Sequence, residues 1–132
     1  MTDHCQILVV DDDVEDHLIL SEYFRDIGKE RCVGFIENGQ KALDFLSTIP
    51  SEEPLPKLIV LDLNMPIMNG SQTLLNLKQT SRFKNIPVII LSTSQNENEK
   101  RKCLSFGAVD YMVKPCTLEE GRTIVDHFVT FI

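Results

Sequence analysis

The sequence has no long hydrophobic run, no basic patch and no cysteine pair with the spacing of metal ligands. None of its apolar runs approaches the roughly 20 residues of a membrane span, and residues 1–6 lack the basic and apolar segments of a signal peptide. The net charge of −7, from 20 acidic and 13 basic residues, opposes binding to nucleic acids and to anionic membranes. We therefore expect a cytoplasmic protein that binds neither.

The cysteines carry no evident chemistry of their own. There are four, without a C-x-x-C pair, and three lie in or beside apolar segments, where a thiol packs as a small hydrophobic group. A metal or redox role requires a ligand spacing that is missing here. We expect Cys5, Cys32, Cys103 and Cys116 to be reduced and structural.

Short apolar runs alternate along the chain with longer segments of helical periodicity. The runs are rich in Ile, Val and Leu at every position, which is typical of parallel strands buried on both faces. We expect strands near residues 6–10, 32–36, 58–61, 86–91 and 108–113. We expect helices near residues 14–27, 38–46, 70–77, 96–106 and 117–131.

Glycine, proline and capping residues mark the ends of these elements. Gly28 and Gly107 follow expected helices as C-terminal caps. Thr117 and Glu120 have the spacing of a capping box at the start of the last helix. Residues 47–57 contain three prolines and are expected to form a surface loop.

This order of elements predicts an α/β fold with a parallel sheet between two layers of helices. Strand and helix alternate five times, as in a doubly wound (βα)₅ three-layer sandwich. A chain of 132 residues with 42% hydrophobic content fits one core and leaves no room for a second catalytic or DNA-binding domain. We expect residues 1–132 to be a single domain whose output comes from its own surface.

Polar residues follow four of the expected strands. Residues 11–13 are all aspartates and follow the first strand, Asp62 follows the third, Ser92 ends the fourth and Lys114 follows the fifth. Ligands of doubly wound sheets bind outside the carboxyl ends of the strands. Carboxylates crowded at this edge repel one another unless a cation lies between them, and Mg²⁺ is the simplest choice because it prefers oxygen ligands.

At these residues the chain resembles the response-regulator receiver domains of the CheY-like superfamily. The matching motifs are ILVVDD at 7–12, LDLNMP at 61–66 with the structural Gly70, LS at 91–92 and KP at 114–115. They occur in order over the whole chain, which is far more specific than any one of them. The resemblance implies the flavodoxin-like strand order 2-1-3-4-5. The chain is also similar to stand-alone receivers that work with phytochrome-type histidine kinases.

The resemblance implies a phosphoryl acceptor and a metal site. Asp62 would take a phosphoryl group from the phosphohistidine of a histidine kinase or a phosphotransfer protein and form an acyl phosphate. Asp11, Asp12, Asp62 and the backbone carbonyl of Asn64 would bind Mg²⁺. Asp13 matches no role in the family and is expected to be a solvated loop or first-turn residue.

The remaining motif residues are implied to support and report phosphorylation. Lys114 would pair with Asp62 and later with the phosphoryl oxygens, while Ser92 would donate its hydroxyl to one of them. Tyr111 would be the switch residue whose ring turns inward, although a plain core tyrosine is the alternative. Pro115 matches the cis proline of the family, although prolines are more often trans.

Signal output is implied to occur through protein contacts. The expected surface is residues 96–132, which would bind a downstream protein, a kinase or a second copy in a homodimer. The domain would phosphorylate and dephosphorylate itself and would turn over no external substrate. Cys116 and Thr93 stand where the family often has phenylalanine and alanine, which leaves the strength of the switch open.

Two other functions remain open. The Asp11-x-Asp13 pattern is found in haloacid-dehalogenase phosphatases, but Glu15 stands where they need a small threonine or valine. The chain is also short for that fold and lacks its cap domain. Phosphorylation of Asp11 instead of Asp62 would favour that class. The second alternative is a receiver-like module that binds partners without being phosphorylated. Such a module has no need to retain together the residues Asp12, Asp62, Ser92 and Lys114. A flavodoxin-like nucleotide binder is disfavoured because three acids replace its phosphate loop.

Overall fold

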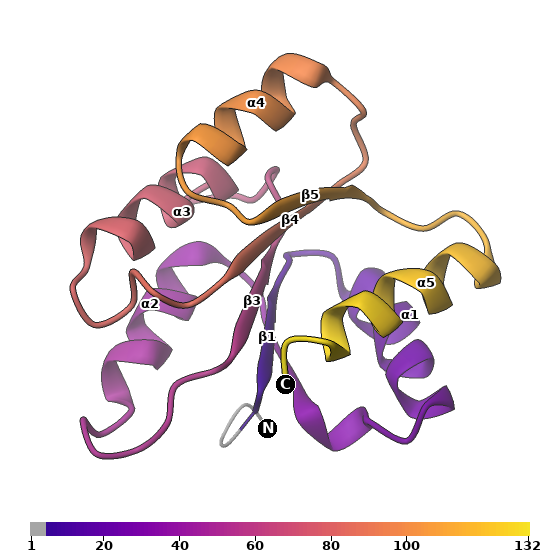
Figure 1. Ribbon diagram of the computed structural model, residues 1–132, viewed down its shortest axis with the longest axis horizontal. Coiled ribbons are helices and arrows are strands. Elements are labelled where there is room, and N and C mark those ends of the chain that lie inside the picture. Colours follow the sequence, from indigo (N-terminus) through magenta and orange to yellow (C-terminus); the bar gives the residue numbers. More distant parts are fainter. Residues whose placement is uncertain (1–4) are drawn as a thin grey trace.

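The computed structural model describes residues 5–132 and contains a parallel sheet between two layers of helices (Figure 1). In this part of the chain the sheet has five strands in the order β2-β1-β3-β4-β5. The strands are β1 (Ile7–Val10), β2 (Val33–Ile36), β3 (Leu58–Leu61), β4 (Val88–Ser92) and β5 (Asp110–Val113). The helices are α1 (Val14–Asp26), α2 (Gly39–Thr48), α3 (Gly70–Gln79), α4 (Glu97–Ser105) and α5 (Leu118–Val129), with a short 3₁₀ helix at Glu30–Cys32. The predicted fold class and strand order are confirmed.

Several element boundaries differ from the sequence prediction by one or two residues; β5, for example, begins at Asp110 instead of residue 108, and α3 ends at Gln79 instead of residue 77. Two further cases are β4 and α2. The fourth strand begins at Val88 instead of residue 86, because the Ile86 N–H closes a turn onto the Phe83 carbonyl and Pro87 has no N–H for the ladder. Helix α2 continues to Thr48, so the proline-containing loop begins two residues later than predicted. Both changes lie at the ends of elements and leave the topology unaltered.

The hydrophobic core has two halves, one on each side of the sheet. Ile7 and Val9 of β1 pack with residues of α1 and α5, whereas Leu8 and Val10 pack with residues of α2 and α3. Figure 1 shows the same division, with α1 and α5 on one side of the sheet and α2, α3 and α4 on the other. This alternation explains why the strands are apolar at every position. None of the helices found within residues 5–132 is long and apolar enough to cross a membrane.

Helix caps were predicted in part. Gly28 and Gly107 do have positive φ angles of 70° and 108°, as C-terminal caps require. The Thr117 hydroxyl accepts the Glu120 N–H as predicted, but the Glu120 carboxylate accepts the N–H of Cys116, so the capping box is incomplete. A full capping box joins Asn69 and Gln72 at the start of α3, where none was predicted.

Candidate functional site

The pairing of β1 with β3 places two aspartates side by side. Val10 and Leu61 are partners in the ladder, and the residues that follow them are Asp11 and Asp62. The Asp62 N–H donates to the Val10 carbonyl at 2.9 Å, which fixes the end of β3 against β1. Both carboxylates are buried, with Asp11 2% and Asp62 6% exposed. The sheet edge therefore holds two acidic side chains that are almost fully buried.

Asp12 completes a cluster that fits a divalent cation. One carboxylate oxygen from each of Asp11, Asp12 and Asp62 lies within 4.8 Å of the other two. Burial, with the charge of Asp62 adding to it, raises the pKa of Asp11 to about 7, although the Asp13 N–H and Lys114 oppose the shift. Burial likewise raises the pKa of Asp62, against the charge of Lys114. A hard cation with oxygen ligands would relieve this repulsion, so the donor set suits Mg²⁺.

Lys114 reaches this cluster from the end of β5. Its backbone N–H donates to the Ser92 carbonyl at 2.7 Å. Its Nζ atom lies 3.6 Å from Asp62 Oδ1, so the expected pair is within ion-pair distance. Burial by itself lowers the pKa of Lys114, but the hydrogen bond to Asp16 and the charge of Asp11 outweigh burial and raise it. Lys114 is therefore the fixed positive charge of the site.

Ser92 and Tyr111 meet at a carboxylate from α4. Ser92 is fully buried, and its hydroxyl donates to Glu99 Oε1 at 3.3 Å. The Tyr111 hydroxyl donates to the same Glu99 oxygen and to the Ser94 carbonyl, the latter at 2.8 Å. Burial and the Glu99 carboxylate raise the pKa of Tyr111. The Tyr111 ring is thus directed inward and joined to the loop after β4.

The backbone after β3 needs Gly70. A Cβ atom at this position would lie 2.3 Å from the Asp62 carbonyl oxygen and 2.7 Å from Leu63 Cα. The Gly70 N–H also donates to the Leu63 carbonyl at 3.0 Å, so the start of α3 closely approaches the backbone that follows β3. The Asn64 N–H donates to Asp62 Oδ1 at 3.4 Å, while its carbonyl as a metal ligand stays a prediction.

The prediction of a cis peptide bond before Pro115 is wrong. No peptide bond within the described residues is cis, so the Lys114–Pro115 bond is trans. The trans isomer of a bond to proline is favoured by about 0.5–1 kcal/mol in the absence of other constraints.

Two residues of the site were missed by the sequence prediction. Asp16 in the first turn of α1 lies 2.6 Å from Lys114 Nζ, and Glu99 in the first turn of α4 accepts from both Ser92 and Tyr111. Asp16 lies within α1, whereas Asp12 precedes the N-cap Asp13, so helical spacing from the aspartates after β1 gives no signal for it. Glu99 belongs to no motif and reaches the site only through the packing of α4. Asp13, expected near the first turn, caps α1 by accepting the Glu15 N–H at 2.9 Å.

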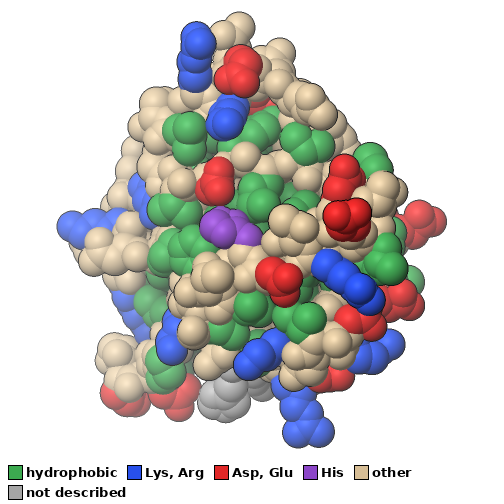
Figure 2. All heavy atoms as spheres, turned by 45° about the vertical axis from the view of Figure 1, so that its right-hand side comes forward, with side chains coloured by type: hydrophobic (Ala, Val, Ile, Leu, Met, Phe, Trp, Pro, Cys, Tyr) green, Lys and Arg blue, Asp and Glu red, His purple; other side chains and the backbone are tan. Residues whose placement is uncertain are grey.

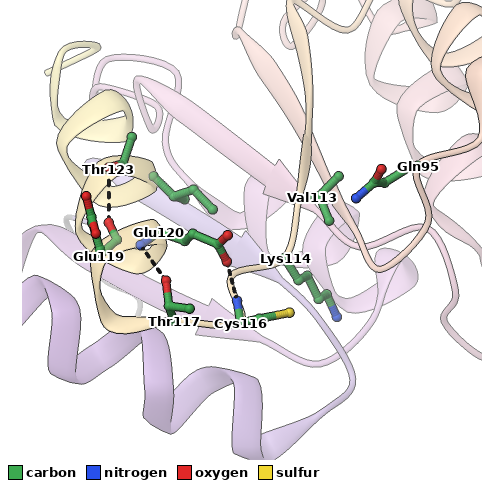
Figure 3. Close-up of a pocket in the computed structure, with 9 residues that line it drawn as sticks. Gln95, Val113, Lys114, Cys116, Thr117, Glu119, Glu120 and Thr123 are labelled. Atoms are coloured by element: carbon green, nitrogen blue, oxygen red, sulfur yellow. Dashed lines mark hydrogen bonds between the residues drawn. The ribbon is translucent and has the colours of Figure 1, made fainter.

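Two of the hollows that border these side chains are large and open. The first, of about 440 Å³, lies over the acidic cluster and is lined by Asp12, Asp13, Val14, Asp62, Asn64, Thr93 and Lys114. The second, of about 690 Å³, lies between the end of β5 and the first turns of α5, with Gln95 on its far side (Figure 3). Figure 3 shows Lys114 at its margin, pointing away from α5. The first hollow gives access to Asp62 from solvent.

The fold and the polar residues at the strand ends together define a receiver-type module of two-component signalling. The family model of the response regulator receiver domain matches residues 7–126. The chain belongs to this family. It is 34% identical over 109 residues to the two-component response regulator ORR5 of Oryza sativa, a match that covers 83% of this chain and 77% of ORR5.

Solved structures agree with this assignment. The phosphorylated cyanobacterial phytochrome response regulator RcpA superposes with a TM-score of 0.83 at 28% identity, covering 97% of this chain and 93% of RcpA. The Mn²⁺-bound form of response regulator Rcp1 gives a TM-score of 0.78 at 28% identity, covering 95% of this chain and 91% of Rcp1. The resemblance to receivers associated with phytochromes is confirmed at the level of structure.

Proposed function

We propose that this chain accepts a phosphoryl group on Asp62 in a Mg²⁺-dependent reaction and signals through protein contacts. The observation that carries the proposal is the position of the Asp62 carboxylate, between two further carboxylates suited to a metal and the ammonium of Lys114. The donor is the phosphohistidine of a histidine kinase or phosphotransfer protein. The chain acts as one receiver domain over residues 1–132, in the cytoplasm, and turns over no external substrate.

The chemistry follows from the groups at this edge. An Asp62 carboxylate oxygen attacks phosphorus, the phosphorus–nitrogen bond breaks, and the imidazole leaves with the bonding electron pair and takes up a proton. Mg²⁺, when bound, would neutralise charge on the phosphoryl oxygens. Lys114 supplies a fixed positive charge beside Asp62, and the Ser92 hydroxyl is a donor at the neighbouring strand end.

The donor protein is expected to bind over α1 and the start of α5. Val14, Leu18 and Ile19 of α1 are 66%, 63% and 46% exposed, and Leu118 at the start of α5 is 55% exposed. Figure 2 shows hydrophobic side chains between acidic and basic ones on the face turned forward from the α1 and α5 side. Val14 also lines the hollow over Asp62, so a partner that covers this surface can present a histidine to the acceptor.

The output surface comprises residues 96–132, and it binds a downstream protein or a second copy of the chain. The Tyr111 hydroxyl and the Ser92 hydroxyl share Glu99, so any movement of Ser92 toward a phosphoryl oxygen breaks a contact with α4. The hollow of Figure 3 lies on this surface beside α5. A change at Asp62 thereby has a short physical route to the surface.

The proposal is tested by the affinity for Mg²⁺ of Asp12→Asn. We expect a loss of at least about tenfold, because one of few carboxylates near the metal loses its charge. Asp13→Asn is the matched control, because asparagine also caps a helix and the neighbouring charge is removed in the same way. Isothermal titration at low salt gives both affinities. Equal, small losses in the two variants would place the metal elsewhere and contradict the proposal.

The Mg²⁺ affinity should also depend on pH through Asp11. Its pKa of about 7 in the folded, metal-free protein means that Mg²⁺ must displace a proton at lower pH. We expect the affinity to rise up to about tenfold per pH unit toward pH 7 and then to level off. Mg²⁺ titrations at several pH values test this prediction. A dependence of Mg²⁺ affinity on pH that persists unchanged in Asp11→Asn would contradict it.

The same pKa affects the stability of the metal-free protein. Since it exceeds the pKa of an unfolded aspartate, the Asp11 contribution to stability is lost as pH rises from about 4 to 7.

A further inference from the structure

The ammonium of Lys114 is shared among three carboxylates at unequal distances. Its Nζ atom lies 2.6 Å from Asp16 Oδ2, 3.1 Å from Asp11 Oδ2 and 3.6 Å from Asp62 Oδ1. The shortest contact is therefore made by a residue that matches none of the motifs. Asp16 comes from the first turn of α1, while the other two carboxylates come from the ends of strands.

We propose that Asp16 is a positioning residue that draws Lys114 toward the margin of the metal-binding carboxylates, so that the ammonium pairs with Asp11 and Asp62 less closely than it would without Asp16. This inference rests on the proposed function, since it assigns Asp11 and Asp62 to the metal and the phosphoryl group. Within residues 5–132, the oxygens close enough to share one ion come from Asp11, Asp12 and Asp62, and Asp16 is outside that group. Its effect on the site must then pass through Lys114.

The reason is competition between two cations for the same oxygens. An ammonium has three donors, and in a largely buried site it pairs strongly with whichever carboxylates surround it. The side chains of Asp11 and Asp62 are only 3% and 7% exposed, so an ammonium released onto them would interact more strongly than it would in water. Bound Mg²⁺ would have to displace it. A charge-assisted hydrogen bond at 2.6 Å to Asp16 occupies one donor and keeps Nζ at the side of the cluster.

The neighbouring Glu15 is a close control for Asp16. Both are acidic residues in the first turn of α1, so both interact favourably with the helix dipole and both carry one negative charge. Glu15 is not among the carboxylates that could share a metal ion, and it forms none of the ion pairs of Lys114. Comparing Asp16→Asn with Glu15→Gln therefore separates the contact with Lys114 from the general loss of charge and of helix stabilisation.

The first experiment measures Mg²⁺ affinity by isothermal titration at low ionic strength. We expect the Mg²⁺ affinity to fall about fivefold in Asp16→Asn and less than about twofold in Glu15→Gln. Asp16→Glu, whose longer carboxylate can still reach the ammonium, should recover wild-type affinity to within about twofold. Asp16→Ser should show the same loss as Asp16→Asn, and circular dichroism establishes that each variant is folded. A loss in Glu15→Gln as large as in Asp16→Asn would overturn the inference.

A double-mutant cycle with Lys114→Gln decides whether Asp16 acts through the ammonium. The direct effect of removing one carboxylate charge is present in both backgrounds, whereas the positioning effect needs Lys114. We expect the factor by which Asp16→Asn lowers the Mg²⁺ affinity to be at least about threefold smaller in the Lys114→Gln background than in the wild-type background. Equal losses would overturn the inference while the proposed function stands, provided that Asp12→Asn weakens Mg²⁺ binding. If the wild-type protein bound no Mg²⁺, the inference about Asp16 and the proposed function would both be contradicted.

Discussion

Replacing Asp62 by asparagine is expected to abolish phosphoryl acceptance and leave the fold intact. The amide has the shape of the carboxylate but lacks the charged oxygen that attacks phosphorus, so the rate should fall by at least about a hundredfold. Lys114 keeps its closer partners Asp16 and Asp11, so no buried positive charge is left alone. Intact-protein mass spectrometry after incubation with acetyl phosphate and Mg²⁺ measures the bound phosphoryl group.

The control for this experiment is Asp13→Asn, which removes a nearby carboxylate but keeps the cap of α1. It should be phosphorylated to the same extent as the wild-type protein. Phosphoryl incorporation into Asp62→Asn at the wild-type level would mean that another residue is the acceptor. The phosphatase alternative would then regain weight if that residue were Asp11.

Replacing Ser92 by alanine is expected to separate acceptance from output. Asp62, Lys114 and the acidic cluster remain, so the variant should still take up a phosphoryl group. Its loss of the hydroxyl removes the contact with Glu99 and the donor for a phosphoryl oxygen, which together connect the site to α4. We expect phosphorylation to shift an equilibrium between two conformations separated by about a few kcal/mol, and one charge-assisted hydrogen bond would be a large part of that difference.

Amide hydrogen exchange over residues 96–132, with and without beryllofluoride, measures the response. We expect a change in the wild-type protein and at least about a threefold smaller change in Ser92→Ala. Ser105→Ala removes an exposed hydroxyl at the far end of α4 and should respond as the wild type does. Equal responses in wild type and Ser92→Ala would show that Ser92 does not carry the signal to this surface.

The fold and the sheet edge were predictable because they depend on local patterns. Strands that are apolar at every position must be covered on both faces, and their parallel arrangement brings the residues after Val10 and Leu61 together. The start of β4 was harder to predict, since Ile86 is apolar but belongs to a turn. The bond before Pro115 was predicted from the family alone, and the structure contradicts it.

The helix-borne residues of the site depend on tertiary packing. Asp16 meets Lys114, 98 residues away in the chain, only because the first turn of α1 and the residue after β5 lie at the same edge of the sheet. Glu99 meets Tyr111 because α4 packs beside β5. The sequence near Asp16 and Glu99 reads as ordinary acidic first turns, and such residues usually stabilise the helix alone. Their connection to the site becomes visible only when the helices are placed on the sheet.

The most direct test of the central claim is to locate the phosphoryl group on the wild-type chain. The protein is incubated with acetyl phosphate, with and without Mg²⁺, and then reduced with tritiated borohydride, which converts an aspartyl phosphate to labelled homoserine. Peptide mapping identifies the labelled position. We predict label at Asp62 alone and only with Mg²⁺. Label at Asp11, or label at Asp62 that does not depend on Mg²⁺, would contradict the account.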